Sequence, residues 1–113
     1  MTKNLDQKGL SSIAKNYSLF YIDLWGVVHN GIKLHDQAIS VLNELLKINK
    51  NFVLLTNAPR PNQTVRAFLE KMGMKEEIRN HVFTSGEAAL NYLKRFYLLE
   101  KFFHPYPFFL KIC

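Results

Sequence analysis

The stretch that decides the fold runs from residue 19 to residue 28 and reads Leu19-Phe20-Tyr21-Ile22-Asp23-Leu24-Trp25-Gly26-Val27-Val28. Its apolar run, rich in aromatic and β-branched residues, is typical of a strand that is covered on both faces. The carboxylate of Asp23 interrupts that run and would be costly to bury without a partner. Open α/β sheets bind ligands at the carboxyl ends of their strands, so Asp23 is a candidate functional residue. The alternative is that Asp23 only begins a turn.

Composition narrows the class of protein. A chain of 113 residues predicts one domain. The net charge of +6 comes from scattered Lys and Arg residues without a dense basic run, so we expect no nucleic-acid partner. The single cysteine, Cys113, excludes an intramolecular disulfide and indicates a reducing compartment. No signal-peptide core is found in residues 1–16 and no apolar run reaches a membrane span, so we expect a cytoplasmic protein without membrane contact.

Outward from the first strand, apolar patterns alternate between strand and helix. Strands are predicted over Leu19–Leu24, Phe52–Leu55 and Val82–Phe83, and helices over Leu10–Tyr17, Gln37–Asn49, Asn62–Met72 and from Thr84 to Phe96. This alternation predicts an α/β fold, in which helices flank a parallel sheet with right-handed crossovers.

Local signals refine these elements. Asn30-Gly31 lies between two short β-prone runs and predicts a hairpin whose two central residues take positive φ, placed as a flap over the end of the first strand. Asp36 and Asn62 are predicted helix N-caps, and Thr84-Ser85-Gly86-Glu87 fits a capping box.

The final residues break the pattern. Seven of the fifteen aromatic residues lie between positions 96 and 113, and His104-Pro105-Tyr106-Pro107 blocks regular helix or central strand. We therefore expect a partial α/β core over residues 1–101 and an atypical, poorly packed aromatic tail over residues 102–113.

Polar residues end the first two strands. In a parallel sheet, Asp23 and Thr56 would both lie at the carboxyl edge, on strands about 4.8 Å apart. A carboxylate there can attack phosphorus, while a hydroxyl and free amides, including those around Asn57, hold the other phosphate oxygens. The alternative for Thr56-Asn57 is an ordinary polar turn, and Arg60 nearby is expected to be an exposed turn residue.

Other kinds of site are not indicated. The four histidines (His29, His35, His81 and His104) lack metal-ligand spacing, and no Gly-rich phosphate loop is present.

Three segments together resemble one family. Residues 22–31 (Ile-Asp-Leu-Trp-Gly-Val-Val-His-Asn-Gly), residues 54–61 (Leu-Leu-Thr-Asn-Ala-Pro-Arg-Pro) and residues 84–87 are similar to motifs of the haloacid dehalogenase superfamily, class IIA branch, over roughly residues 10–94. The resemblance implies a Rossmann-like core with a flap and Asp23 as the nucleophile that forms an aspartyl-phosphate. It also implies that Thr56 and Asn57 bind phosphate, and that Asp23 and the backbone carbonyl of Trp25 hold Mg²⁺.

The chain departs from the family pattern in two ways. Most phosphatases of this superfamily have a general acid and base two residues after the nucleophile, where this chain has Trp25. The family's later Lys and carboxylate motifs lie beyond its cap domain, past residue 113. The resemblance therefore implies the amino-terminal piece of such a protein, without the cap domain and the carboxyl-terminal half of the core.

Three functions follow as hypotheses. The first is a Mg²⁺-dependent phosphohydrolase that acts on a small phosphorylated metabolite. The second is a non-catalytic remnant that keeps part of the phosphate site. The third is a phospho-accepting signalling module, which is disfavoured because such modules need an additional acidic pair near Asp23.

Overall fold

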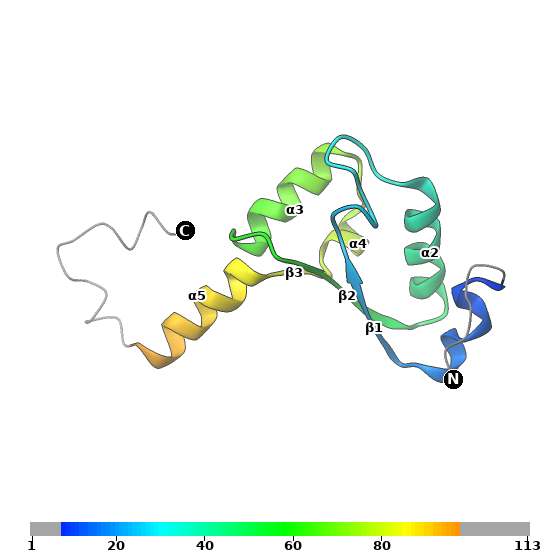
Figure 1. The fold of residues 1–113 in the computed structure, drawn as a ribbon, viewed down its shortest axis with the longest axis horizontal. Coiled ribbons are helices and arrows are strands. Elements are labelled where there is room, and N and C mark those ends of the chain that lie inside the picture. Colours follow the sequence, from blue (N-terminus) through cyan, green and yellow to red (C-terminus); the bar gives the residue numbers. More distant parts are fainter. Residues whose placement is uncertain (1–7, 98–113) are drawn as a thin grey trace.

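A three-stranded parallel sheet forms the centre of the molecule. The computed structural model describes residues 8–97, and Figure 1 shows their arrangement. The strands β1 (Leu19–Asp23), β2 (Asn51–Thr56) and β3 (Val82–Thr84) lie in the order β1-β2-β3. All pairs are parallel, with Asp23 opposite Leu55 and Thr56 opposite Thr84. The predicted α/β fold is confirmed.

Helices connect the strands. They are α2 (Asp36–Lys47) between β1 and β2, then α3 (Asn62–Lys71) and the single turn α4 (Glu76–Arg79) between β2 and β3, and α5 (Ser85–Phe96) after β3. Two crossovers that run in the same direction along a sheet, both of the usual right hand, place their helices on the same face. The core lies on that face. It consists of Leu24, Val28, Leu42, Leu45, Phe52, Leu54, Leu69, Met74, Ile78 and Val82.

The expectation that β1 is covered on both faces is wrong for the part of the chain that the structure describes. Phe20 and Ile22 pack against the core, whereas the side chain of Tyr21 is 68% exposed. Leu55 and Phe83 are exposed on the neighbouring strands. The reason is that α2, α3 and α4 all lie on the core face, and apolar composition alone does not tell which face a helix covers.

The helix beginnings also differ from the predictions. Asp36 and Asn62 are the first residues of their helices, while His35 and Pro61 occupy the N-cap positions without a side-chain bond. Asp36 therefore acts only through its charge in the first turn, which the helix dipole favours. The predicted helix over Leu10–Tyr17 is instead two 3₁₀ turns, η1 (Leu10–Ser12) and η2 (Ala14–Asn16), of which only Ala14 is buried.

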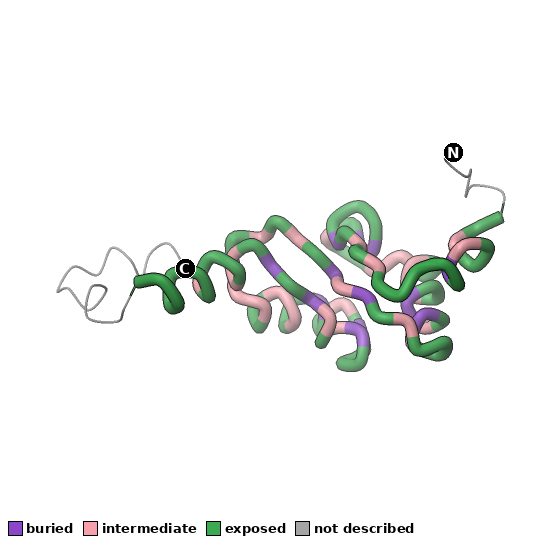
Figure 2. Tube along the Cα trace, turned by 90° about the horizontal axis from the view of Figure 1, so that it is seen from below, coloured by how far each residue is buried: buried purple, intermediate pink, exposed green. Residues whose placement is uncertain are grey.

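Helix α5 extends away from the sheet. Figure 2 shows that the residues of its later turns are exposed, in contrast to the buried segments of the strands. None of the helices formed by residues 8–97 is long and apolar enough to cross a membrane. The predicted aromatic tail, residues 102–113, lies outside the described residues.

Candidate functional site

The three residues proposed for phosphate chemistry lie together. Asp23 ends β1, Thr56 ends β2, and Asn57 follows directly. All three line one cavity of about 830 Å³ at the carboxyl edge of the sheet, which we call the edge cavity. Its wall also includes Trp25, Thr84 and Ser85. The predicted juxtaposition of Asp23, Thr56 and Asn57 at one edge is confirmed.

The carboxylate of Asp23 is accessible. It is exposed, and its Oδ1 accepts a hydrogen bond of 2.9 Å from the backbone N–H of Leu24. Thr56 is half-buried, and its Oγ1 accepts from the N–H of Ala58 at 3.4 Å. The hydroxyl hydrogen of Thr56 remains available to donate to an anion, and Asn57 is exposed beside it.

A tight turn after β1 carries the loop of residues 24–35, which we call the flap. The carbonyl of Leu24 accepts from the amides of Val27, Val28 and His29 at 3.3, 2.8 and 3.2 Å. Leu24 and Val28 are each only 1% exposed, so the base of the flap is anchored in the core. Trp25, between these anchors, is left 64% exposed at the edge cavity.

The predicted hairpin turn is wrong in its geometry, although the flap itself is present. Gly31 has φ of 88°, but Asn30 does not take a positive φ. Instead, the Asn30 Oδ1 accepts from the N–H groups of Ile32 and Lys33, each at 2.9 Å, and an antiparallel bridge joins His29 to Leu34. The asparagine side chain thus closes a longer turn of the kind that Asn commonly makes.

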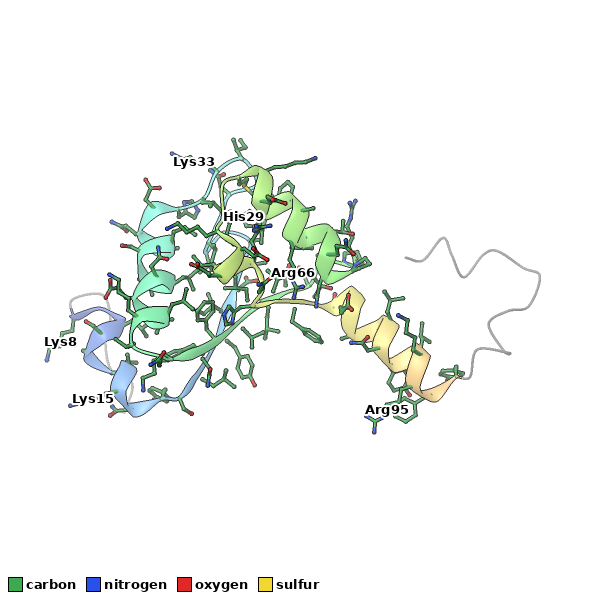
Figure 3. The ribbon with its side chains drawn as sticks, turned by 180° about the vertical axis from the view of Figure 1, so that it is seen from behind. Lys8, Lys15, His29, Lys33, Arg66 and Arg95 are labelled. Carbon is green, nitrogen blue, oxygen red and sulfur yellow. The ribbon has the colours of Figure 1, made fainter. Side chains whose placement is uncertain are left out.

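The buried side chain of His29 stabilises the flap, to which it belongs. It is 5% exposed, and its Nδ1 accepts from the N–H of Gly31 at 3.0 Å. Figure 3 labels this flap residue, and its ring meets Trp25 and, on α3, Phe68 edge-on, with centroids 5.4 and 5.8 Å away. Burial, with a smaller effect from nearby His35, lowers the pKa of His29 below its ordinary value of 6.5, against the opposing charge of Asp23.

This lowered pKa predicts an acid-sensitive flap. The folded state disfavours the charged imidazole, so the unfolded state binds more protons and the free energy of unfolding should fall as the pH drops below 6.5. In denaturant titrations without divalent metal, we expect His29→Phe to show a smaller loss over this range than the parent chain. An equal pH dependence in the two proteins would contradict the assignment.

The junction of β3 and α5 positions the loop that follows Thr56. The N–H of Gly86 and the Oγ of Ser85 both donate to the carbonyl of Ala58 at 3.1 Å, and the Thr84 hydroxyl donates to the carbonyl of Arg60. Gly86 is needed here because any β-carbon would collide with the backbone of Arg60. Sequence reasoning missed this function of Gly86, although the glycine itself was visible in the predicted capping box.

A reciprocal set of bonds joins the beginnings of α3 and α5. Thr84 caps α5, since its Oγ1 accepts from the N–H of Glu87 at 2.9 Å, which confirms half of the capping box. The other half is wrong, because the Glu87 carboxylate accepts from the N–H of Asn62 at 2.9 Å. The Asn62 Oδ1 in turn accepts from the N–H of Thr84 at 2.9 Å. A local capping box would have the Glu87 carboxylate accept from the N–H of Thr84. Here Asn62 accepts from that N–H, and Glu87 accepts from the N–H of Asn62 instead.

We expect Glu87→Ala to lower the free energy of unfolding by about 1–2 kcal/mol, the usual cost of losing a helix cap. Glu87→Gln keeps an oxygen acceptor for the Asn62 N–H and should lose less. The matched control is Glu44→Ala, which removes only an exposed ion pair with Lys47. Chemical denaturation of the three variants tests this, and equal losses in Glu87→Ala and Glu44→Ala would contradict it.

The oxygen atoms near Asp23 are of the type that a hard cation binds, but there are too few of them to complete its coordination. A carboxylate and a backbone carbonyl are ligands that Mg²⁺ accepts. No hydrogen bond between described residues uses the carbonyl of Trp25. Within residues 8–97, however, no group of three or more His, Cys, Asp or Glu side chains gathers in a way that could hold a metal ion. A Mg²⁺ ion held by Asp23 and Trp25 would keep mainly water ligands.

Comparison with known proteins decides the family. A family model described as haloacid dehalogenase-like hydrolase matches residues 20–103, which include the edge cavity and the flap. The chain belongs to this family. Comparison with curated proteins found no match.

Solved structures share the fold of this chain. A hydrolase of this family from Brucella suis 1330 is 32% identical, with a TM-score of 0.69, over 74% of this chain and 31% of that protein. A putative nagD protein is 33% identical, with a TM-score of 0.59, over 70% of this chain and 32% of that protein. A hypothetical protein from Pyrococcus horikoshii, 23% identical with a TM-score of 0.59, shares the fold over 71% of this chain and 31% of its own. The chain thus spans about a third of the length of these proteins.

Proposed function

We propose that this haloacid dehalogenase-like chain provides the nucleophile and phosphate-binding edge of a phosphate monoester hydrolase. The observation that carries the proposal is the meeting of Asp23 with Thr56 and Asn57 in the edge cavity. An accessible carboxylate can act as a nucleophile toward phosphorus, and adjacent hydroxyl and amide donors can stabilise the non-reacting phosphoryl oxygens. The substrate class we propose is a small phosphorylated metabolite of the cytoplasm.

The chemistry follows from these groups. A carboxylate oxygen of Asp23 forms a bond to phosphorus while the bond between phosphorus and the ester oxygen breaks, which leaves an aspartyl-phosphate. Thr56 donates its hydroxyl hydrogen to a phosphoryl oxygen and keeps the group aligned. A bound Mg²⁺ would neutralise part of the phosphoryl charge. Trp25 cannot transfer a proton, so the departing alkoxide must take its proton from water. Attack of water on the aspartyl-phosphate then releases phosphate and restores the carboxylate.

Formation of a stable mimic of the aspartyl-phosphate tests the proposal without requiring turnover. Beryllium fluoride with Mg²⁺ forms a tetrahedral adduct on an accessible carboxylate nucleophile, and fluorine NMR detects it. We expect a bound resonance in the parent chain, its loss in Asp23→Asn, and weaker binding in Thr56→Val. Asp36→Asn is the matched control, because Asp36 is exposed at the start of α2, and it should keep the adduct. Absence of the adduct from the parent chain, or its persistence in Asp23→Asn, would refute the assignment.

A second candidate is phosphate binding without turnover. It is favoured by the lining of the edge cavity: among the described residues that form it, Asp23 is the only carboxylate and none is a lysine. The adduct experiment is expected to succeed in both cases, and a turnover assay separates them.

A further inference from the structure

A second cavity adjoins the phosphate edge. It has a volume of about 330 Å³ and lies between the flap, the end of β2 and α3; we call it the aromatic cavity. Trp25 and Thr56 line both this cavity and the edge cavity, so the two share a wall. A ligand whose phosphate lies at Asp23 and Thr56 would therefore have the aromatic cavity beside it.

Three aromatic rings are among the side chains that line this cavity. Trp25 and His29 come from the flap, and Phe68 comes from α3. His29 stands nearly perpendicular to both of the others, at 89° to Trp25 and 71° to Phe68. Trp25 and Phe68 are 64% and 43% exposed, so both keep uncovered ring surface. Exposed aromatic rings around a concave site favour planar apolar groups, which they meet by stacking or edge contacts.

The ring of Trp25 lies close against Gly31. Two of its atoms, Cη2 and Cζ3, lie 2.6 and 2.8 Å from where a β-carbon of residue 31 would stand, and Gly31 leaves that space free. The Gly31 N–H bonds to the His29 ring, which meets the Trp25 ring edge-on. These contacts within the flap restrict the Trp25 ring before a ligand arrives, which reduces the ordering cost of binding.

We propose that the aromatic cavity binds the organic part of the phosphate ester and selects small, planar aromatic esters over aliphatic ones. This inference rests on the proposed function, since it takes the phosphate of the same ligand to lie in the edge cavity. Trp25, which lines both cavities, is the specificity residue on the flap side, and Phe68 is its counterpart on α3.

Binding to the full chain tests the inference. Dissociation constants are measured by calorimetry for inorganic phosphate, phenyl phosphate and glycerol phosphate, with Mg²⁺ present. Quenching of the fluorescence of Trp25, the only tryptophan, gives an independent reading. We expect phenyl phosphate to bind more tightly than glycerol phosphate by on the order of tenfold, as aromatic contacts of ordinary strength provide.

Variants test whether the aromatic cavity is the source of the preference for phenyl phosphate. Phe68→Ala should clearly reduce the ratio of the two affinities, and Phe68→Leu, which retains apolar volume for folding, should reduce it less. Tyr92→Ala removes an exposed aromatic ring of α5 that lines neither cavity, and it should keep the ratio. Circular dichroism confirms that each variant is folded.

Two failures can be distinguished. Equal affinity for the aromatic and aliphatic esters, or a preference that survives both Phe68 variants, would overturn the inference while phosphate binding and the Asp23 adduct still support the proposed function. If inorganic phosphate does not bind and the adduct is also absent, the proposed function fails and the inference fails with it.

Discussion

Gly86→Ala is expected to destabilise the fold by about 3 kcal/mol, the upper part of the usual range for overpacking. A β-carbon at position 86 would lie 2.6 Å from the carbonyl oxygen of Arg60 and 2.7 Å from its carbonyl carbon. These are backbone atoms, so no side-chain rotation can relieve the contact. Either α5 must move away from the 57–61 loop or that loop must shift.

The Gly86→Ala substitution should also disturb the edge cavity. The 57–61 loop begins directly after Thr56, and the Gly86 N–H bonds to the carbonyl of Ala58. A displaced loop should therefore also weaken the beryllium fluoride adduct on Asp23. Urea denaturation measures the stability, and Ala89→Ser, a one-atom addition at an exposed position of the same helix, is the control. Wild-type stability in Gly86→Ala would show that this close approach does not exist in solution.

The second large effect is on catalysis: the 113-residue chain should show no phosphatase turnover above background. Hydrolysis of phosphate monoesters requires acceleration of up to ~10²¹-fold, which several groups must provide together. The edge cavity contains the proposed nucleophile, Asp23, and a hydroxyl that can donate to phosphate, but its described lining contains no lysine and no second carboxylate. The indole of Trp25 cannot supply general acid catalysis, which is typically worth about 10²–10⁴-fold in rate.

The assay compares the parent chain with Asp23→Asn, with Mg²⁺ and a chromogenic phosphate ester. Identical rates are expected, because both should report only background hydrolysis. Steady Mg²⁺-dependent turnover in the parent chain that disappears in Asp23→Asn would contradict the prediction. It would also show that Asp23, Thr56 and solvent suffice for hydrolysis.

Together with the adduct experiment, this assay separates the two proposed functions. An adduct with turnover indicates a hydrolase complete within 113 residues. An adduct without turnover indicates phosphoryl acceptance or phosphate binding that needs further groups for hydrolysis.

The sequence by itself determined the strands, their parallel direction and the polar residues at their ends. Apolar runs closed by Asp23 and Thr56 specify both the strands and the edge where those side chains meet, because parallel strands end at the same side. The end of α3 is also locally encoded, since Gly73, with φ of 90°, follows that helix and glycine favours such a conformation. Such signals are local, and short-range backbone chemistry is sufficient to produce them.

Only the tertiary structure decided which groups meet across distant segments. The hydrogen bond from the N–H of Asn62 to the carboxylate of Glu87 joins residues 25 positions apart, so no capping rule based on sequence neighbours predicts it. The contact of His29 with Phe68 likewise depends on how the flap packs against α3. The open face of the sheet at Tyr21 follows from crossovers that place the core helices on the other face. Apolar character shows that a residue can be buried, but burial itself depends on which element packs over it.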